Sequence, residues 1–342
     1  MPSPILVQLV GIANAQLYHT IEYLDGTFQP FLGNVNQQES NDPGPLTDVT
    51  CSWGLNQDLH VFAINDPNTG PSPSPVWYTV RNSDGSWQPS FTNLQQQIPN
   101  MPQQIMSITS CPDVTASQII HVCAGMNTPG GLWYGYYNLN TRTWTTEAVT
   151  TSSFGVGIPE RIDSVVDSSG SLHVFFSAAG FVKDNVTAWH TSRSPQGQWQ
   201  PGFDLIPSIN IDSASVIYTL EAIRATLVND PSLGIQLFGT TAIGELIVAN
   251  PQVNPWNAPF TDQTTTGLTG TVFTDVAGTY LDAVTIPPST VFRMCAVANG
   301  GQPGQLWYDN TTVDPLAFFP LADYVSMPPY PFSKIAIAGF HQ

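Results

Sequence analysis

Two stretches of this chain follow one pattern: QLYHTIEYLDGTFQP at residues 16–30 and PVWYTVRNSDGSWQP at residues 75–89. Each starts with an aromatic-containing pair, passes through an Asp-Gly turn and ends with an aromatic residue followed by Gln-Pro. Asp-Gly flanked by alternating hydrophobic residues is a strong local signal for a β-hairpin. Both stretches therefore predict two strands joined by a tight turn, and their recurrence indicates a repeat.

A second motif, which we call the anchor, marks this repeat along the whole chain. Its five residues are hydrophobic, polar, hydrophobic, hydrophobic and usually small, which is the alternation of a half-buried strand. The copies are VQLVG (7–11), LHVFA (59–63), IHVCA (120–124), LHVFF (172–176), IQLFG (235–239) and FRMCA (292–296). The polar second residues, Gln8, His60, His121, His173, Gln236 and Arg293, recur every 52 to 63 residues.

Each anchor is preceded by a β-branched stretch and followed by a strand with an aromatic or apolar pair, a turn and a closing aromatic residue. Four short antiparallel strands in 50–60 residues form one blade of a β-propeller. We therefore predict an all-β fold, a six-bladed propeller formed by residues 1–342 as one domain. The first blade lacks an innermost strand, and KIAIAG at 334–339 is predicted to supply it by pairing with the N-terminal strand.

Charge and composition exclude several classes of partner. The chain has a formal net charge of −17 and only eight Lys and Arg residues, so it would repel nucleic-acid phosphates. No apolar run is long enough to predict a membrane span. The acidic, lysine-poor composition and N-x-T sequons at Asn185 and Asn310 favour a secreted or extracellular location, although no signal peptide opens the chain and a cytoplasmic location stays open.

The sequence carries none of the common motifs for metals, cofactors and covalent catalysis. The four cysteines form no C-x-x-C pair, so they are interpreted as buried thiols, with a Cys111–Cys123 disulfide as the alternative. No nucleophile elbow, zinc-binding helix motif, phosphate loop or dinucleotide-binding turn occurs. We expect no metal site and no cofactor, because a ring of blades would hold His60, His121 and His173 apart.

Within a repeat, the chain runs through apolar-His-Val-Phe, a loop, Leu-Trp-Tyr or Leu-Trp-His, and Asp-Gly-x-Trp, with copies such as LHVF (59–62), LWY (132–134) and DGSW (84–87). This order resembles the repeats of tectonin-like and bacterial propeller lectins, and it is similar in layout to fungal fucose-binding propeller lectins. In the fucose-binding family, an Arg on the anchor strand and a Glu on the next strand hold a sugar between blades, against aromatic rings. Here Arg293 alone matches the Arg position. The Glu position holds His19, Tyr78, Tyr134, His190, Val248 and Tyr308, so we do not expect fucose recognition by that pair.

Two sets of side chains are candidate ligand contacts because they recur at equivalent positions. Polar groups can hydrogen-bond sugar hydroxyls, and aromatic rings can lie against the apolar face of a sugar. The candidates are His60, Tyr78, His121, Tyr134, His173, His190, Arg293, Tyr308, Trp77, Trp133, Trp189 and Trp307. The alternative for both sets is structural, with polar groups bonding across blades and Trp rings filling the space between them.

Two functional hypotheses follow. The first is a lectin that binds glycans at aromatic-lined clefts between blades, where repeated weak sites gain avidity. The alternative is a cofactor-independent enzyme for a small hydrophobic molecule, similar to fungal propellers that catalyse hetero-Diels–Alder reactions, with one asymmetric pocket built by the long loops 63–75 and 207–219. A weaker third option is a glycoside hydrolase or lyase that uses Asp48, Asp163 and Asp282 around the central channel.

Overall fold

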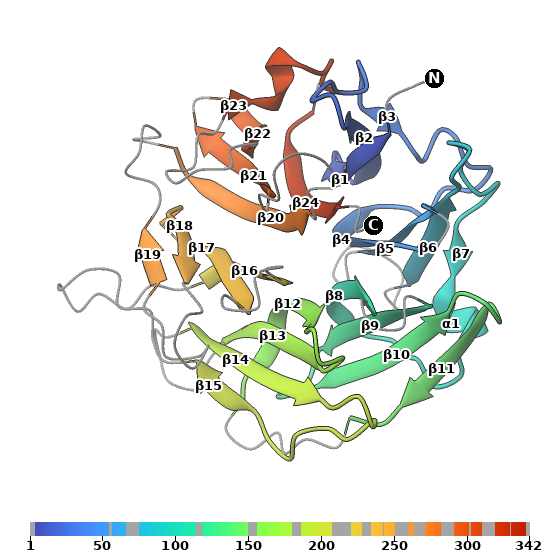
Figure 1. Cartoon of the computed structure of the whole chain (residues 1–342), viewed down its shortest axis with the longest axis vertical. Coiled ribbons are helices and arrows are strands. Elements are labelled where there is room, and N and C mark those ends of the chain that lie inside the picture. The colour runs from blue at the N-terminus through green and yellow to red at the C-terminus, as the bar shows by residue number, and fades with distance from the viewer. Residues whose placement is uncertain are drawn as a thin grey trace.

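The structure is a computed structural model in which short antiparallel sheets are arranged radially around a centre (Figure 1). The residues that it describes are 4–54, 57–65, 75–113, 118–149, 156–179, 186–206, 220–227, 234–241, 243–249, 260–262, 271–281, 291–300, 302–309, 319–328 and 330–339. Within these ranges, six four-stranded antiparallel sheets form the blades, which confirms the predicted six-bladed propeller.

The blades are numbered along the chain, and the strands of each are named from the innermost to the outermost. Blade 1 contains β24 (Phe332–Gly339), β1 (Ile5–Ala13), β2 (Gln16–Tyr23) and β3 (Gly33–Asn34). Blade 2 contains β4 (Leu46–Trp53), β5 (Leu59–Asn65), β6 (Val76–Arg81) and β7 (Thr92–Asn93). Blade 3 contains β8 (Ile105–Pro112), β9 (Ile119–Met126), β10 (Leu132–Asn138) and β11 (Thr143–Glu147).

The second half repeats this arrangement. Blade 4 contains β12 (Ile158–Val166), β13 (Leu172–Ala179), β14 (Val186–Arg193) and β15 (Asp204–Ile206). Blade 5 contains β16 (Leu220–Leu227), β17 (Ile235–Thr241), β18 (Leu246–Ala249) and β19 (Phe260–Asp262). Blade 6 contains β20 (Phe273–Leu281), β21 (Val291–Gly300), β22 (Gln302–Asp309) and β23 (Phe319–Pro320). Two short helices, α1 (Leu94–Gln97) and η1 (Leu321–Asp323), lie between strands.

Every anchor lies in the second strand of its blade, as the repeat predicted. The ring closes where β24 pairs antiparallel with β1, from Val7 opposite Gly339 to Ala13 opposite Phe332. This confirms the predicted pairing of the two ends, and the closing strand starts two residues earlier than the predicted 334–339. One blade therefore combines strands from both ends of the chain (Figure 1).

Carboxylates on alternate innermost strands link neighbouring blades near the centre. Asp48, Asp163 and Asp275 each accept a hydrogen bond from a backbone N–H of the next innermost strand. The donors are the N–H groups of Ile108 at 3.1 Å, Ala225 at 2.7 Å and Ile335 at 2.9 Å. Because Ile335 lies on β24, the third link also holds the closing strand in place.

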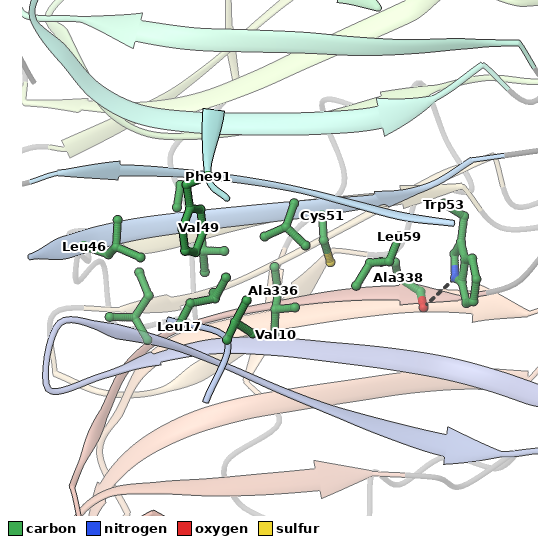
Figure 2. Close-up of a cluster of buried hydrophobic side chains, with 14 residues drawn as sticks. Val10, Leu17, Leu46, Val49, Cys51, Trp53, Leu59, Phe91, Ala336 and Ala338 are labelled. Carbon is green, nitrogen blue, oxygen red and sulfur yellow. Dashed lines mark hydrogen bonds between the residues drawn. The ribbon is translucent and has the colours of Figure 1, made fainter. Parts of the chain in front are cut away.

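We call the packed interface between two neighbouring blades a seam, and name it by the blade numbers. Figure 2 shows seam 1/2, where side chains of β1 and β2 meet those of β4 and β5 and two alanines of β24. The Trp53 indole N–H donates to the Ala338 carbonyl oxygen at 2.9 Å across this seam. Other hydrophobic clusters fill the remaining seams, so the core of this fold is a set of blade-to-blade interfaces.

The described residues contain neither a disulfide bond nor a candidate membrane-spanning helix. Cys51, Cys111, Cys123 and Cys295 are buried and free, which supports the interpretation as thiols over a Cys111–Cys123 disulfide. In the part of the chain that the structure describes, no helix has the length and apolar character needed to cross a membrane.

Candidate functional site

The seams bring together many of the predicted ligand contacts. Each anchor's polar second residue faces the next blade, beside the third-strand side chain that lies opposite the anchor's fourth residue in the same blade. His60 Nδ1 and the Tyr78 hydroxyl share a hydrogen bond of 2.7 Å, and the equivalent His121 Nδ1 and Tyr134 hydroxyl share one of 2.8 Å. We call such pairs floor pairs, because they are buried inside the seam and the side chains of its outer part cover them.

These two floor pairs are buried. Tyr134 is fully inaccessible to solvent, and the other three residues are less than a tenth exposed. Burial lowers the pKa of His60 and of His121 to about 4, so both imidazoles are neutral at pH 7. Burial also raises the pKa of both tyrosines, which keeps their hydroxyls protonated. Each pair satisfies the imidazole Nδ1 and the tyrosine hydroxyl, in line with the structural alternative, and ligand contact by these residues stays a prediction.

Blades 1 and 4 have different floor pairs. In blade 1, His19 Nε2–H donates to Gln8 Oε1 at 2.6 Å, and both side chains are buried. In blade 4, His173 Nδ1 lies 3.0 Å from His190 Nε2, and His173 Nε2 lies 3.0 Å from a carboxylate oxygen of Asp167. Burial, followed by the neighbouring His173, lowers the pKa of His190 to about 3.

The four predicted Trp contacts lie on the opposite side of their blades and pack against the preceding blade. Trp77 packs in seam 1/2, Trp133 in seam 2/3, Trp189 in seam 3/4 and Trp307 in seam 5/6. Each ring therefore helps to fill the space between two blades, as the structural alternative predicted. Seams 2/3 and 3/4 bring together a floor pair from one blade and a Trp from the next.

The sequence interpretation missed a third recurring position, which we call the rim residue. It lies on the third strand, three residues after the floor-pair position, and pairs with the first residue of the anchor. The rim residues are Glu22 opposite Val7, Arg81 opposite Leu59, Tyr137 opposite Ile120 and Arg193 opposite Leu172. Each rim residue faces the preceding blade. An alignment of the third strands on the anchors would have revealed this position, but not the partners of the rim residues across the seams.

Seam 3/4 holds a charged pair. Arg193 Nε donates to Glu147 Oε2 at 3.0 Å, and Arg193 Nη2 donates to Glu147 Oε1 at 2.8 Å. The guanidinium carbon lies 5.1 Å from the centre of the Tyr134 ring, which adds a cation–π contact. The closing Trp199 meets Tyr134 edge to face at 5.4 Å. This seam therefore balances its rim cation with an acid from the outermost strand of blade 3.

Seam 1/2 has the same rim residue and no such acid. Arg81 is half-buried and forms no ion pair within 4 Å among the described residues. Burial lowers its pKa, whereas Tyr23 and exposed Asp84 act in the opposite direction. The floor residue His19 meets the closing Trp87 edge to face at 5.3 Å. Burial and the charge of Arg81 together hold the pKa of His19 well below its usual value.

Seam 6/1 reverses the roles of floor and rim. Arg293, the anchor residue of blade 6, donates from Nε to Oε2 of the rim residue Glu22 at 3.2 Å. The Glu22 side chain is fully buried. This pair differs from the one described for the fucose-binding family, because the acid comes from the rim position of the neighbouring blade rather than from the next strand of the same blade. Tyr308 pairs through its backbone in β22, and its side chain lies outside the described part.

Several buried nitrogen atoms in the seams have no hydrogen-bond partner among the described residues. They are Gln8 Nε2 and His60 Nε2 of the floor pairs, Arg81 Nη1 of the rim, and the indole Nε1 atoms of Trp77, Trp189 and Trp199. Buried polar groups in folded proteins normally have a partner. These atoms therefore mark positions where water or the polar groups of a ligand would be stabilised.

The other predicted sites receive no comparable support. Loop 207–219, residues 66–74 of the other long loop, Asp282 and both sequons lie outside the described residues. Asp48 and Asp163 accept backbone hydrogen bonds of the ring and are not arranged as an exposed acid–base pair. Within the described ranges, no three His, Cys, Asp or Glu side chains are grouped as metal ligands.

Comparison with known proteins identifies the fold and not the family. No protein-family model matches the chain, and no curated protein matches it. Among solved structures, Hadza microbial sialidase Hz136 superposes with a TM-score of 0.56 at 10% identity, over 89% of this chain and 65% of the sialidase. This chain thus corresponds to less than two thirds of that protein.

A second solved structure has a more similar length. Penicillium chrysogenum α-L-arabinanase complexed with arabinobiose gives a TM-score of 0.52 at 11% identity, over 80% of this chain and 81% of the arabinanase. Identities of this size show a shared fold alone. The chain is thus similar to propellers of two carbohydrate-active enzymes, and its own chemistry must be argued from its seams.

Proposed function

We propose that this protein binds glycans at the outer parts of the seams between blades. The observation that carries the proposal is a recurring group in seams 1/2, 2/3 and 3/4, made of a half-buried closing Trp, a rim residue and a buried floor pair. The closing residues are Trp87, Trp144 and Trp199, and the rim residues are Arg81, Tyr137 and Arg193. Sugars fit such groups because they offer an apolar face to an aromatic ring and hydroxyls to polar side chains.

The floor pairs have a supporting role in this proposal. A neutral His bonded to a Tyr or Gln holds the seam rigid beneath the rim, and a rigid site loses less entropy when it binds. The unpaired indole N–H groups of Trp189 and Trp199 offer donors to hydroxyl oxygens in seam 3/4. The likeness to a sialidase and to an arabinanase complexed with arabinobiose agrees with a carbohydrate ligand.

Repeated sites explain why a propeller suits this role. Three similar rims on one ring can engage a branched or clustered glycan together, so that weak individual contacts yield a useful overall affinity. No single deep pocket is needed for such binding. An extracellular location, where glycans are displayed, is part of the same proposal.

The direct test is a glycan array probed with folded full-length protein, followed by titration of the best ligands. We expect binding to at least one glycan class and a loss of about tenfold or more in the triple variant Trp87→Leu, Trp144→Leu, Trp199→Leu, which removes the aromatic surfaces and keeps apolar bulk. The matched control is Trp53→Leu, which removes a buried Trp of seam 1/2 from the innermost strand, two strands inside the rim residue Arg81. Absence of binding across a broad array, or equal binding by the triple variant, would overturn the proposal.

A further inference from the structure

The seams differ most in how the rim cation is balanced, and this difference assigns a ligand class to one of them. We propose that seam 1/2 binds the carboxylate of an acidic sugar, through Arg81 and the amide of Gln8. The inference rests on the proposed glycan-binding function and names the chemical class that this one seam selects.

The position that supplies the acid in seam 3/4 is a glycine in seam 1/2. On the outermost strand of blade 3, Glu147 lies opposite the floor residue Tyr134. The residue at the same register of blade 1, opposite the floor residue His19, is Gly33. Arg81 and Arg193 are equivalent in register, yet only Arg193 faces a carboxylate. At this register blade 1 therefore supplies no acid to Arg81, and we place the external carboxylate on that side of the guanidinium.

Side chains from both sides of this seam carry buried hydrogen-bond donors without acceptors in the described part of the chain. Arg81 Nη1 and Gln8 Nε2 are buried donor atoms with no acceptor among the described residues, and Gln8 is fully buried. Gln8 uses its oxygen to accept from His19, so its amide nitrogen is left to donate. Arg81 pairs with Trp87, whose ring centre lies 5.3 Å from that of His19, and the charge of Arg81 helps to lower the pKa of His19, so the guanidinium belongs to the same seam as the floor pair. A carboxylate would accept from both donors, and hydrogen bonds to a charged group are the stronger kind.

Other titratable groups around Arg81 do not neutralise it. Asp84 acts on Arg81 from an exposed turn, where water screens the interaction. Tyr23 carries a phenol and not a carboxylate. Glu39 accepts from Thr79, two residues before Arg81 on β6, and burial raises its pKa to about 7. Glu39 is therefore only partly ionised at neutral pH, and it is not among the groups that shift the pKa of Arg81.

The ligand is a monoanion on these grounds. One guanidinium and one amide match the two oxygens of a carboxylate. The net charge of −17 opposes a dianion such as a phosphate monoester more strongly than a carboxylate. Repulsion between the ligand and distant acidic residues is screened beyond about 8 Å at physiological ionic strength. The nearby charge of Arg81 therefore dominates the electrostatic energy of binding. The guanidinium lies directly beneath a surface turn, with Nη2 3.2 Å from where a Gly85 Cβ would lie.

The experiment compares glucuronate with glucose, which differ by a carboxylate in place of a hydroxymethyl group, and includes acetate as a carboxylate without a sugar. Binding is followed by NMR titration of the full-length protein. We expect glucuronate to bind about tenfold or more tightly than glucose, since a charge-assisted pair contributes roughly 1.5–3 kcal/mol. Arg81→Gln should abolish this preference, and Arg142→Gln, which removes an exposed arginine from a blade 3 turn, should keep it.

Two further variants test the role of the glycine without altering Arg81. Gly33→Glu introduces the acid of seam 3/4 into seam 1/2 and should also abolish the preference for glucuronate. Its Cβ would lie 3.1 Å from Gln38 Nε2, the end of an exposed and flexible side chain that can move. Glu147→Gln removes the acid from Arg193 and should create a second carboxylate site in seam 3/4.

Each outcome decides the inference. Equal binding of glucuronate and glucose, or an unchanged preference in Arg81→Gln, overturns it. If neutral sugars bind and carboxylates bind no better, the glycan function stands and the carboxylate site falls. If no sugar binds while acetate binds to the native chain and not to Arg81→Gln, the carboxylate site stands and the glycan function falls. If the Glu147→Gln variant still binds glucuronate at one site only, the role assigned to position 147 is overturned.

Discussion

Seams 1/2 and 3/4 are built to the same plan but have different floor pairs and different residues at one outer position. Both have an Arg at the rim, a closing Trp beside a buried floor pair, and a glycine turn above the guanidinium. In seam 3/4 the outer strand β11 has five residues and brings Glu147 to Arg193, whereas in seam 1/2 the outer strand β3 has two residues and presents Gly33. The repeat therefore fixes the scaffold, and a residue outside the repeat pattern sets the charge of each seam.

This difference shows how a propeller can change its ligands without losing its fold. Seam 6/1 balances its charges by a buried Arg293–Glu22 pair, and seam 2/3 has the neutral rim residue Tyr137. The anchors and inner strands carry the packing in every case, so substitution at a rim or outer position alters charge at little cost to the core.

Removing the closing strand should produce the largest effect, and it should affect the two seams unequally. A chain that ends at Pro331 loses β24, including the alanines that pack in seam 1/2 and the acceptor for Trp53. We expect no cooperative thermal unfolding, because the lost pairing exceeds the typical margin of about 5–15 kcal/mol when ring closure is lost with it. Circular dichroism melts against the full chain test this, and equal melting temperatures would show that closure does not matter.

The charged pair of seam 3/4 gives the next largest effect. Glu147→Gln leaves the guanidinium of Arg193 partly buried without its acid, and we expect a loss of about 2 kcal/mol in unfolding free energy. A double-mutant cycle with Arg193→Gln, measured by urea unfolding, isolates the coupling between the two side chains. Arg81→Gln paired with Gly33→Ala should show no coupling, and a similar coupling in both cycles would contradict the comparison between the seams.

The fold could be predicted from the sequence because local sequence patterns that repeat along the chain specify it. The anchors alternate strictly between hydrophobic and polar residues, and the turns carry Gly at positive φ, such as Gly26 and Gly85. The first blade lacked one strand in the sequence pattern, and residues 334–339 matched the pattern of the missing strand. These features describe pairing inside a blade, where partners follow each other along the chain. The prediction of six blades needed no knowledge of contacts between blades.

The candidate site was only partly readable, because it depends on which residues meet across a seam. The anchor and third-strand residues were identified as candidates, and the structure pairs His60 with Tyr78 and His121 with Tyr134. The rim residues were missed because their partners lie on the preceding blade. Glu22 and Arg293 are 271 residues apart in the chain and 3.2 Å apart in space, a separation that no repeat alignment within one blade reveals.

The titration of His19 tests whether Arg81 is an uncompensated charge. Burial and Arg81 lower the pKa of His19, so Arg81→Gln should raise it while burial keeps it below 6.5. Since the folded pKa lies below the unfolded one, neutral His19 stabilises the fold above about pH 6.5, and this contribution is lost as the pH falls. Arg81→Gln should weaken that loss. Imidazole NMR signals measure the shift, and His121, two seams away with a pKa of about 4, should not move.

The glycine turns above the two arginines give the smallest and most specific test. Gly85 and Gly197 have φ of +91° and +85°, so alanine at either costs about 1 kcal/mol in backbone strain alone. A Cβ would also lie 3.2 Å from Arg81 Nη2 or 3.0 Å from Arg193 Nη2.

Arg193 is held by Glu147 and by Tyr134, whereas Arg81 has no acid to hold it and can shift. Gly197→Ala should therefore destabilise the protein by about 0.5 kcal/mol more than Gly85→Ala, measured by urea unfolding. Adding Glu147→Gln to Gly197→Ala releases the guanidinium and should remove most of that excess. If the excess persists, the ion pair is not what fixes Arg193, and the contrast between the two seams must have a cause other than position 147.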